Sequence, residues 1–240
     1  AARLARQLQA PLVWMGNFGW DAIYGPMGPA FAHWTHQASS AYRQGDALIA
    51  CPFAMAMPWG LPSTAVGLTP GRPRHDPEQL RQRFALPTES EHTVMVGFGG
   101  MGLAVAADAF ERWPRHRFLV TDPALACGAA NLTLVPPDLR PLELLPLCGR
   151  ILTKPGYSTF CEALAAGVGV HLVRREGFAE APVLEAALQR HSPHRLLSRQ
   201  QLQQGDWQLD QPLHPPSGPP LPDGGDQQAA ELLQRLATRI

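Results

Sequence analysis

One stretch, residues 150–173, constrains the fold more than any other part of the sequence. It reads as an apolar strand over 150–153, a tight turn at Pro155-Gly156, a helix that ends at Gly167 and a second apolar strand over 168–173. A helix N-terminus presents unpaired backbone N–H groups and the positive end of the helix dipole. The turn is therefore suited to receive an anion such as a phosphate.

The residues around this turn supply further groups for an anionic ligand. The candidates are Lys154, Gly156, Tyr157, Ser158 and Thr159. Glu162 follows one turn into the helix, where its carboxylate could accept hydrogen bonds from ribose hydroxyls. An alternative is that Thr159-x-x-Glu162 is only a capping box, with Glu162 folded back on the backbone of Thr159.

The pattern after residue 93 alternates apolar strands with helices, which is typical of an α/β fold with a parallel sheet covered on both faces. The expected strands are 93–96, 118–121, 132–135, 150–153 and 168–173, and the expected helices are 103–112, 142–147 and 183–190. Before them, helices are expected over 1–10, 30–42 and 76–84, and strands over 12–15 and 47–51. The segment 52–74 is rich in Pro and Gly and reads as a surface connection.

Two separated segments resemble the GT-B glycosyltransferases of the family-28 type, and most closely a glycosyltransferase-like group that includes the N-terminal half of plant arabinokinase. One is residues 154–164 followed by Arg174-Arg175 and the sequence Gly-Phe-Ala-Glu-Ala-Pro at 177–182. The other is residues 16–24, Gly-Asn-Phe-Gly-Trp-Asp-Ala-Ile-Tyr. The resemblance implies an α/β, GT-B-like fold with two Rossmann-like domains, and transfer of a sugar from a nucleotide diphosphate donor, expected to be a UDP-sugar.

The resemblance also implies a domain plan. Residues 1–72 would be the C-terminal part of an incomplete, acceptor-side domain, because a complete GT-B enzyme usually exceeds 240 residues. Residues 73–210 would bind the nucleotide sugar. Residues 211–240 would form a Pro/Gly-rich linker and a C-terminal helix that braces the first domain.

In this scheme Gly156, Tyr157, Ser158 and Thr159 stabilise the leaving diphosphate with Lys154 as a nearby charge, and Glu162 holds the ribose. Further donor-side candidates are Gly99, Gly100, Met101, Arg174, Arg175 and Glu180. Helix dipoles and cationic side chains can stabilise a diphosphate without a metal. No cofactor or metal is therefore expected, and the acceptor is left open.

Asp21 is the candidate for the catalytic residue, because a Gly-flanked loop carboxylate could orient an acceptor hydroxyl or act as a base. Trp14, Phe18, Trp20 and Trp34 could stack on a sugar or lipid, although aromatic residues at this density more often form core. The pair His33 and His36 lacks a carboxylate at metal-ligand spacing, and His171, in an apolar strand, is interpreted as a core residue.

A competing interpretation is an NAD(P)-dependent oxidoreductase. Residues 97–102 form a complete G-x-G-x-x-G after a strand and before an expected helix, and Asp122 follows the next strand. However, a dinucleotide domain gives no reason for the second anion-binding turn at 154–159, and Pro123 makes Asp122 a plausible turn residue. Glycosyl transfer is favoured. A non-catalytic nucleotide-sugar-binding module and a nucleotide-sugar epimerase stay open.

The composition argues against some classes of binding partner. Acidic and basic residues number 20 each, which argues against nucleic-acid binding, since that requires a basic field. No apolar run is long enough to span a bilayer, which leaves room for peripheral membrane contact only. The four cysteines show no C-x-x-C pairing, which favours buried thiols in a cytoplasmic protein.

Overall fold

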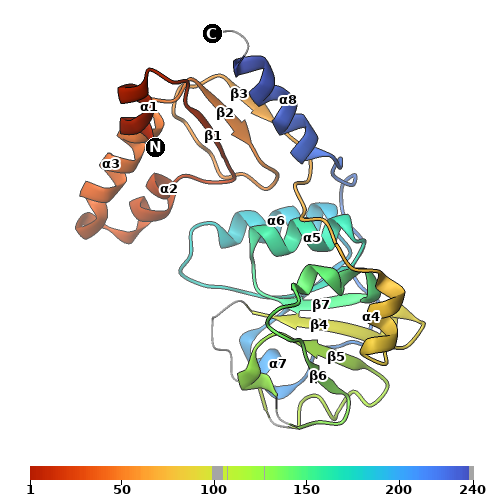
Figure 1. Ribbon diagram of the computed structural model, residues 1–240. Helices are drawn as coiled ribbons and strands as arrows, with labels where there is room; N and C mark the ends of the chain where they lie inside the picture. The colour runs from red at the N-terminus through yellow and green to blue at the C-terminus, as the bar shows by residue number, and fades with distance from the viewer. Residues whose placement is uncertain (99–104, 107, 127, 238–240) are drawn as a thin grey trace. The chain divides into compact units, whose positions relative to one another are not determined.

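The computed structural model describes residues 1–98, 105–106, 108–126 and 128–237, and the chain forms two compact units (Figure 1). Unit 1 consists of Ala1–Thr69, Glu176–Ala187 and Leu221–Ile240, and unit 2 of Pro70–Arg175 and Leu188–Pro220. The segment Glu176–Ala187, assigned above to the second domain, thus belongs to unit 1. The division crosses a helix, α6 (Ala181–His191).

Unit 2 is built on a six-stranded parallel sheet with the order β6-β5-β4-β7-β8-β9 (Figure 1). Its strands are β4 (Thr93–Gly97), β5 (Arg117–Val120), β6 (Leu132–Leu134), β7 (Arg150–Thr153), β8 (Gly169–Val173) and β9 (His194–Leu197). Numbered within the unit, this is the 3-2-1-4-5-6 order of a doubly wound Rossmann fold. The chain reverses its direction of winding between β4 and β7.

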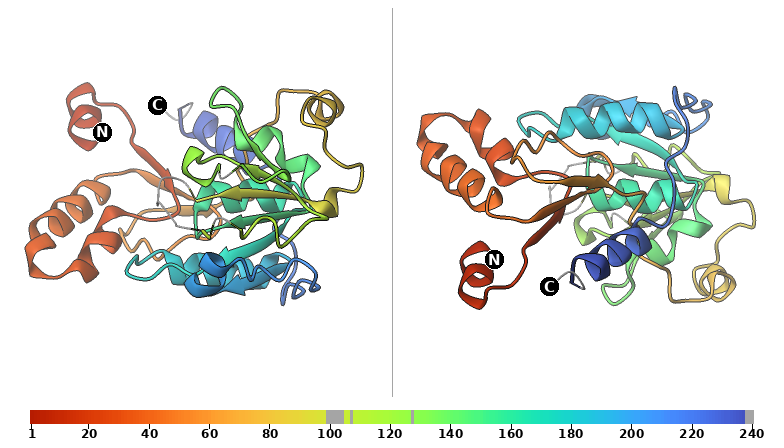
Figure 2. Two further views of the ribbon diagram at one scale, coloured as in Figure 1. Left: turned by 90° about the horizontal axis from the view of Figure 1, so that it is seen from below. Right: turned by 90° about the horizontal axis from the view of Figure 1, so that it is seen from above.

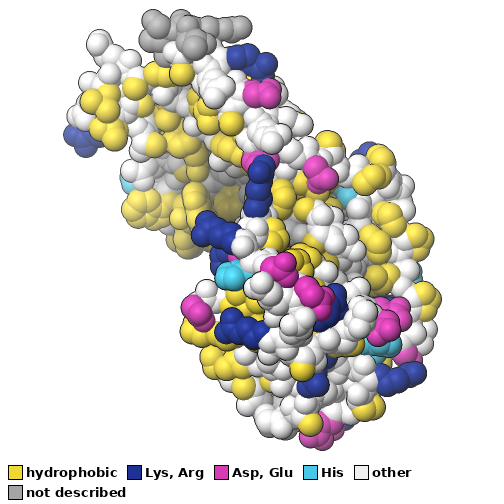
Figure 3. Space-filling model, turned by 45° about the vertical axis from the view of Figure 1, so that its right-hand side comes forward, with side chains coloured by type: hydrophobic (Ala, Val, Ile, Leu, Met, Phe, Trp, Pro, Cys, Tyr) yellow, Lys and Arg dark blue, Asp and Glu magenta, His cyan; other side chains and the backbone are white. Residues whose placement is uncertain are grey.

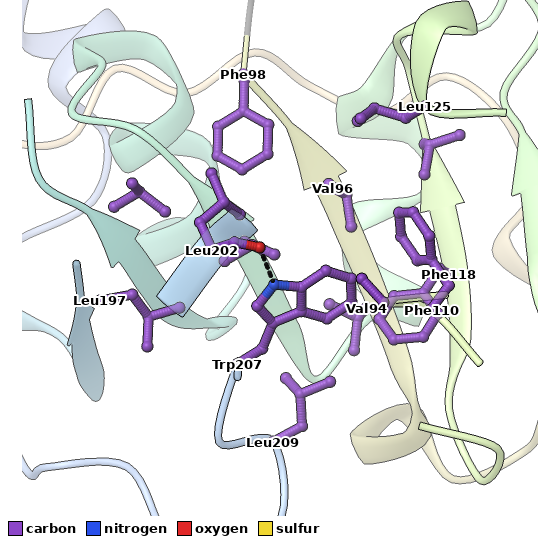
Figure 4. Close-up of a cluster of buried hydrophobic side chains, with 14 of the residues drawn as sticks. Val94, Val96, Phe98, Phe110, Phe118, Leu125, Leu197, Leu202, Trp207 and Leu209 are labelled. Carbon is purple, nitrogen blue, oxygen red and sulfur yellow. Dashed lines mark hydrogen bonds between the residues drawn. The ribbon is translucent and has the colours of Figure 1, made fainter. Parts of the chain in front are cut away.

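The apolar composition of the central strands explains their position. Val94, Met95 and Val96 of β4 are fully buried, as expected for a parallel strand covered on both faces. Figure 4 shows the core on one face of this sheet, centred on Trp207. Its indole Nε1 donates a 3.0 Å hydrogen bond to the carbonyl of Leu202, so the polar edge of the buried ring is paired.

Two helices of unit 2 begin at side-chain caps; the start of the first was predicted, whereas the second was not. Asp76 caps α4 (Pro77–Arg83) by accepting a hydrogen bond from the backbone N–H of Gln79. Ser198 and Gln201 form a reciprocal capping box at α7 (Arg199–Gln204). The helix of the central motif is α5 (Tyr157–Ala165). Figure 2 shows unit 2 from two further sides, with its strands stacked between helical segments.

Unit 1 contains a three-stranded parallel sheet, β1-β2-β3, in its described residues. The strands are β1 (Val13–Gly16), β2 (Ala47–Ala50) and β3 (Ser63–Ala65). The helices are α1 (Ala2–Leu8), α2 (Trp20–Tyr24), α3 (Ala32–Tyr42) and α8 (Gly225–Ala237), with two short 3-10 segments, η1 (Gly25–Met27) and η2 (Pro29–Phe31). Ala229 of α8 packs against Ile49 and Val66, so the end of the chain contributes to the core of this unit.

Several sequence-based expectations are wrong. The described residues of the range 103–112 form turns, because the N–H of Ala106 donates to the carbonyl of Gln203 instead of entering a helix. The range 142–147 forms two 3-10 turns, η5 (Pro141–Glu143) and η6 (Leu145–Leu147), each with a proline. The segment 52–74 contains β3 and the buried Trp59, so it is more than a surface connection.

The C-terminal Pro/Gly-rich segment is also more ordered than its composition suggests. His214 exchanges two backbone hydrogen bonds with His194 of β9, and Leu213 packs close to Gly169 of β8. These contacts lie within unit 2. His214 therefore pairs with the edge strand of the sheet, and this part of the segment is packed on unit 2.

Candidate functional site

The reversal of winding in unit 2 brings the carboxyl ends of β4 and β7 together at one edge of the sheet. Gly97 ends β4 and Thr153 ends β7, and these strands are hydrogen-bonded neighbours with Gly97 opposite Thr153. The hydroxyl of Thr153 donates a 2.7 Å hydrogen bond to the carbonyl oxygen of Gly97. In open parallel sheets, ligands bind outside the carboxyl ends of the strands at such a switch point.

The N-terminus of α5 lies directly after this point. Gly156 is the N-cap residue in extended conformation, and the first intrahelical bond of the helix runs from the N–H of Phe160 to the carbonyl of Gly156, 3.0 Å. Gly156 has no side chain to cap the helix. The N–H groups of Ser158 and Thr159 therefore belong to the first turn, which has no intrahelical acceptor and is suited to an anion.

This geometry rules out the capping-box alternative. A capping box would require Thr159 at the N-cap, whereas Thr159 is the third residue of α5 and Glu162 the sixth. Glu162 consequently projects from the helix body, about 7–8 Å along the axis from Tyr157. Its carboxylate is available for another contact.

Gly156 also leaves space in front of the helix. A Cβ built on Gly156 would lie 3.8 Å from Oγ1 of Thr159 and 3.9 Å from the carbonyl oxygen of Lys154, which are ordinary contacts. The φ angle of −158° is open to any residue. Neither the space around Gly156 nor its backbone conformation therefore demands a glycine at this position.

Three cationic residues follow two neighbouring strands at the same edge. Lys154 comes directly after β7, and Arg174 and Arg175 come directly after β8, which pairs with β7. Lys154 and Arg175 are half-buried, and Arg174 is exposed. Three basic residues thus leave the sheet at the edge that carries the α5 N-terminus.

Glu162 is half-buried beside the segment that opens unit 2. Its Oε1 lies 3.6 Å from the position of a Cβ built on Gly71. Burial raises the pKa of Glu162, while the charge of Arg140 acts in the opposite direction. A carboxylate that is desolvated in this way gains more from hydrogen bonds to a ligand hydroxyl than an exposed carboxylate would.

A buried carboxylate that the sequence analysis missed holds the same region in place. Glu143 is almost fully buried and accepts hydrogen bonds from the backbone N–H of Arg74, 2.6 Å, from the N–H of His75, 3.2 Å, and from Nε of Arg140, 2.8 Å. Burial raises its pKa, but these hydrogen bonds outweigh burial and bring the pKa to about 2. The spacing of Arg140 and Glu143 in a Pro-initiated turn is the only sequence signal for it.

Three of the expected donor-side residues, Gly99, Gly100 and Met101, lie outside the described residues, as does Gly102 of the G-x-G-x-x-G sequence. Only the first glycine of that sequence, Gly97, is described. Asp122, the carboxylate of the competing dinucleotide interpretation, accepts a 2.9 Å hydrogen bond from the N–H of Ala124 and caps the 3-10 segment η4 (Pro123–Leu125). Its role as a turn residue is confirmed.

The remaining candidates lie in unit 1. Asp21 is in the first turn of α2, and its Oδ2 accepts a 2.9 Å hydrogen bond from the indole of Trp59. A Cβ on Gly19 would clash with Asp21 and Trp59, at 2.3 and 2.4 Å, so the glycine permits this contact. Asp21 is therefore fixed by a helix and an indole and is not on a flexible loop.

Glu180 is buried in unit 1 and accepts a 2.5 Å hydrogen bond from Nδ2 of Asn17. The two residues come from the two sequence segments on which the resemblance rests. The sequence alone indicates no role for Asn17.

The other titratable candidates have structural surroundings. His171 is fully buried, and its Nε2 accepts a 2.9 Å hydrogen bond from Nη1 of Arg150. Burial, with the charge of Arg150, lowers its pKa to about 3, so it is neutral. Cys51, Cys148 and Cys161 are buried thiols, as predicted, and Cys127 lies outside the described residues. Within the described part of the chain, no three His, Cys, Asp or Glu side chains form a group that could hold a metal.

Comparison with known proteins places this geometry. No protein-family model matches the chain. L-arabinokinase from Arabidopsis thaliana is 26% identical over 222 residues, which covers 86% of this chain and 20% of that protein. UGT89C1 from Arabidopsis thaliana, solved with quercetin, superposes with a TM-score of 0.60 at 16% identity, over 87% of this chain and 57% of its own.

Two more solved structures agree. Phytolacca americana UGT2 in complex with UDP-2fluoro-glucose and pterostilbene gives a TM-score of 0.62 at 14% identity, over 87% of this chain and 63% of its own. The spinosyn forosaminyltransferase SpnP gives 0.57 at 17% identity, over 85% and 61%. The chain has the GT-B fold. Its two parallel sheets are the counterparts of sheets in these GT-B glycosyltransferases, as the sequence resemblance predicted.

The match is partial in length. The chain spans a fifth of the L-arabinokinase and 57–63% of the solved GT-B chains.

Among the described residues, no helix is long and apolar enough to cross a membrane. On the face of the molecule drawn in Figure 3, basic, acidic and histidine side chains are intermingled.

Proposed function

We propose that this chain carries the donor-binding machinery of a glycosyltransferase that moves a sugar from a nucleotide diphosphate, expected to be a UDP-sugar, to an acceptor. The observation that carries the proposal is the N-terminus of α5 at the switch point, next to Lys154 and the Thr153–Gly97 hydrogen bond. Solved GT-B structures with similar folds contain UDP or UDP-sugars, which supports this ligand class.

In this proposal the backbone N–H groups of Ser158 and Thr159 stabilise the negative charge that develops on the diphosphate as the glycosidic bond breaks. Their hydroxyls, the N–H of Tyr157 and the ammonium of Lys154 add hydrogen bonds and positive charge. Because these groups are fixed by the helix before the ligand arrives, they need no reorganisation during the reaction. No metal is assigned a role.

Glu162 is assigned to the ribose, because it projects beyond the first turn of α5. Arg174 and Arg175 are assigned to the charged end of the donor, and Gly99, Gly100 and Met101 to the wall of the donor cleft. Glu180 remains a candidate for the donor sugar. Asp21 remains the candidate for orienting or deprotonating the acceptor, now as a carboxylate that is positioned by Trp59.

An NAD(P)-dependent reaction is the second candidate, because the 3-2-1-4-5-6 strand order of unit 2 is also that of dinucleotide-binding domains. Ligand binding distinguishes the two. We expect UDP to raise the melting temperature and NADH to leave it unchanged, and Lys154→Ala to weaken UDP binding. Tight NADH binding without a response to UDP or GDP would reverse the assignment. Release of free UDP from a UDP-sugar in the presence of acceptors separates a transferase from a binding module.

A further inference from the structure

Unit 2 has two neighbouring hollows at the edge of its sheet opposite to the proposed nucleotide site. The larger, about 670 Å³, is lined by residues 85–87 and by the loops before β5 and β6. The smaller, about 450 Å³, is lined by Glu91, His92, Arg115, Arg150 and Asp210, among others. Pro114, Arg115 and His116 line both. We call the smaller one the amino-edge hollow.

The position of the amino-edge hollow follows from the parallel sheet. His92 directly precedes β4, His116 directly precedes β5, and Arg150 is the first residue of β7. The amino ends of parallel strands share one edge, so these side chains meet there. Nucleotide sites of doubly wound sheets lie at the carboxyl ends. The hollow is therefore separate from the site assigned to the donor.

The two histidines face each other with unused polar atoms. Their ring centroids are 5.6 Å apart, with an interplanar angle of 76°. The Nδ1 atoms of both His92 and His116 are buried and have no hydrogen-bond partner among the described residues. Buried polar atoms without partners are rare in folded proteins, and each calls for an explanation such as a ligand or ion.

Two arginines at the hollow have side-chain N–H groups that donate to no described residue. Arg150 uses Nη1 for His171 and for the carbonyl of Gln211, while its Nε and Nη2 donate to no atom in the described part of the chain. Arg115 is exposed and makes no hydrogen bond with the described residues. Guanidinium groups with free N–H pairs match the geometry of phosphate oxygens.

The electrostatic surroundings of His116 are positive. Burial lowers its pKa most, and the charges of His92, Arg150 and Arg115 lower it further, whereas Asp210 acts in the opposite direction. Of the other charged residues at the hollow, Arg112 is paired with Asp108, 2.9 Å, and Glu91 lies 3.7 Å from Nε2 of His92. The arginines thus outweigh the carboxylates at the position of His116. A bound anion would offset this excess of positive charge.

We propose that the amino-edge hollow binds a phosphate-type anion, held by Arg115 and Arg150 with His92 and His116 beside it. Its volume lies within the range of small-ligand sites and accommodates a phosphate monoester as well as free phosphate. The charges of the two arginines favour binding of the anion, and those of Glu91 and Asp210 oppose it.

The test follows the histidine side-chain signals of the full chain by NMR during titration with inorganic phosphate at constant pH and ionic strength. We expect saturable shifts of the His92 and His116 signals. Arg115→Gln, at an exposed position, should lower the affinity about tenfold or more. The matched variant Arg199→Gln, at an exposed position of α7, should leave the affinity unchanged.

Shifts that do not saturate, or an equal affinity in the Arg115→Gln protein, would overturn the proposal. A parallel titration with glucose 1-phosphate identifies the source of the anion: tighter binding than inorganic phosphate indicates a phosphorylated metabolite, and equal binding indicates free phosphate. A third titration uses UDP on the Lys154→Ala protein. If His92 and His116 respond to UDP alone, and lose the response in this variant, the effect originates at the carboxyl edge and the hollow is not a site.

Discussion

The side-chain amide of Asn17 donates a 2.5 Å hydrogen bond to the carboxylate of Glu180, and both residues are buried in unit 1. The contact joins the loop after β1 to the segment before α6. Two sequence segments that resemble one protein group are thus connected directly in space. Their co-occurrence has a structural reason in addition to any role in binding.

We expect Asn17→Ala to destabilise unit 1 by about 1–3 kcal/mol, because it removes a donor from a buried carboxylate. Hydrogen exchange in β2 and in residues 176–187 measures the effect within that unit. Glu180→Gln keeps an acceptor for Asn17 and should cost less. No loss in Asn17→Ala together with a clear loss in Glu180→Gln would mean that the charge of Glu180, and not this hydrogen bond, stabilises the unit.

Glu162→Gln should weaken UDP binding by about 1.5–3 kcal/mol, the range for a hydrogen bond to a charged group. It should also raise the stability of unit 2 at neutral pH. Burial raises the pKa of Glu162, so ionisation in the folded state is unfavourable, and stability is lost as the pH rises through that raised pKa. Glutamine avoids this loss.

Calorimetry and chemical denaturation of the same Glu162→Gln sample test both parts of the prediction. The control variant is Glu231→Gln, at an exposed position of α8. Weaker binding together with lower stability would point to a structural defect instead of a lost ribose contact.

The buried His171 makes folding sensitive to acid. Burial and the charge of Arg150 lower its pKa in the folded protein to about 3, below its unfolded value of about 6.5. The unfolded state therefore binds the proton first, and the free energy of unfolding falls as the pH drops from about 6.5 towards 3. His171→Leu should flatten this slope in urea titrations at several pH values. An unchanged slope, equal to that of the exposed-site variant His33→Leu, would contradict the assignment.

Glu143→Gln should destabilise unit 2 by about 3 kcal/mol, as expected when one partner of a buried ionic network is removed. The hydrogen bonds from Arg74, His75 and Arg140 hold its pKa at about 2 against the effect of burial. Its contribution to stability is present above the unfolded pKa, about 4.3, and is lost as the pH falls towards 2. Denaturation at neutral pH checks the magnitude, with Glu78→Gln in exposed α4 as the comparison.

Most of the unit 2 sheet could be predicted from the sequence, because its strands are continuous apolar runs bounded by clear turn residues. β7 was predicted to the residue, and β4 and β8 to within one. β9 was missed because its sequence, His-Arg-Leu-Leu, has a single fully buried residue, Leu197, and resembles the end of a helix.

The candidate site could be predicted only where its residues are close to one another in the sequence. The helix N-terminus at Gly156 follows from the Pro-Gly turn, so its position could be read from neighbouring residues. The backbone N–H partners of Glu143 lie 68 and 69 positions away in the sequence, and Asn17 and Glu180 are 163 positions apart, so no short-range pattern encodes these contacts. The range 103–112 was misjudged for the same reason: a distant carbonyl, that of Gln203, captures the N–H that a helix would use.

The hydroxyl of Thr153 helps to order the strand ends before a ligand binds. Adjacent strands already lie about 4.8 Å apart, and the additional bond from Thr153 to the carbonyl of Gly97 fastens their last residues together. The end of β4 is thus held beside the turn that leads into α5 before any ligand is present. A diphosphate at the N-terminus of α5 would meet N–H groups that follow an already fixed strand end, so little of its binding free energy would be spent on ordering the protein.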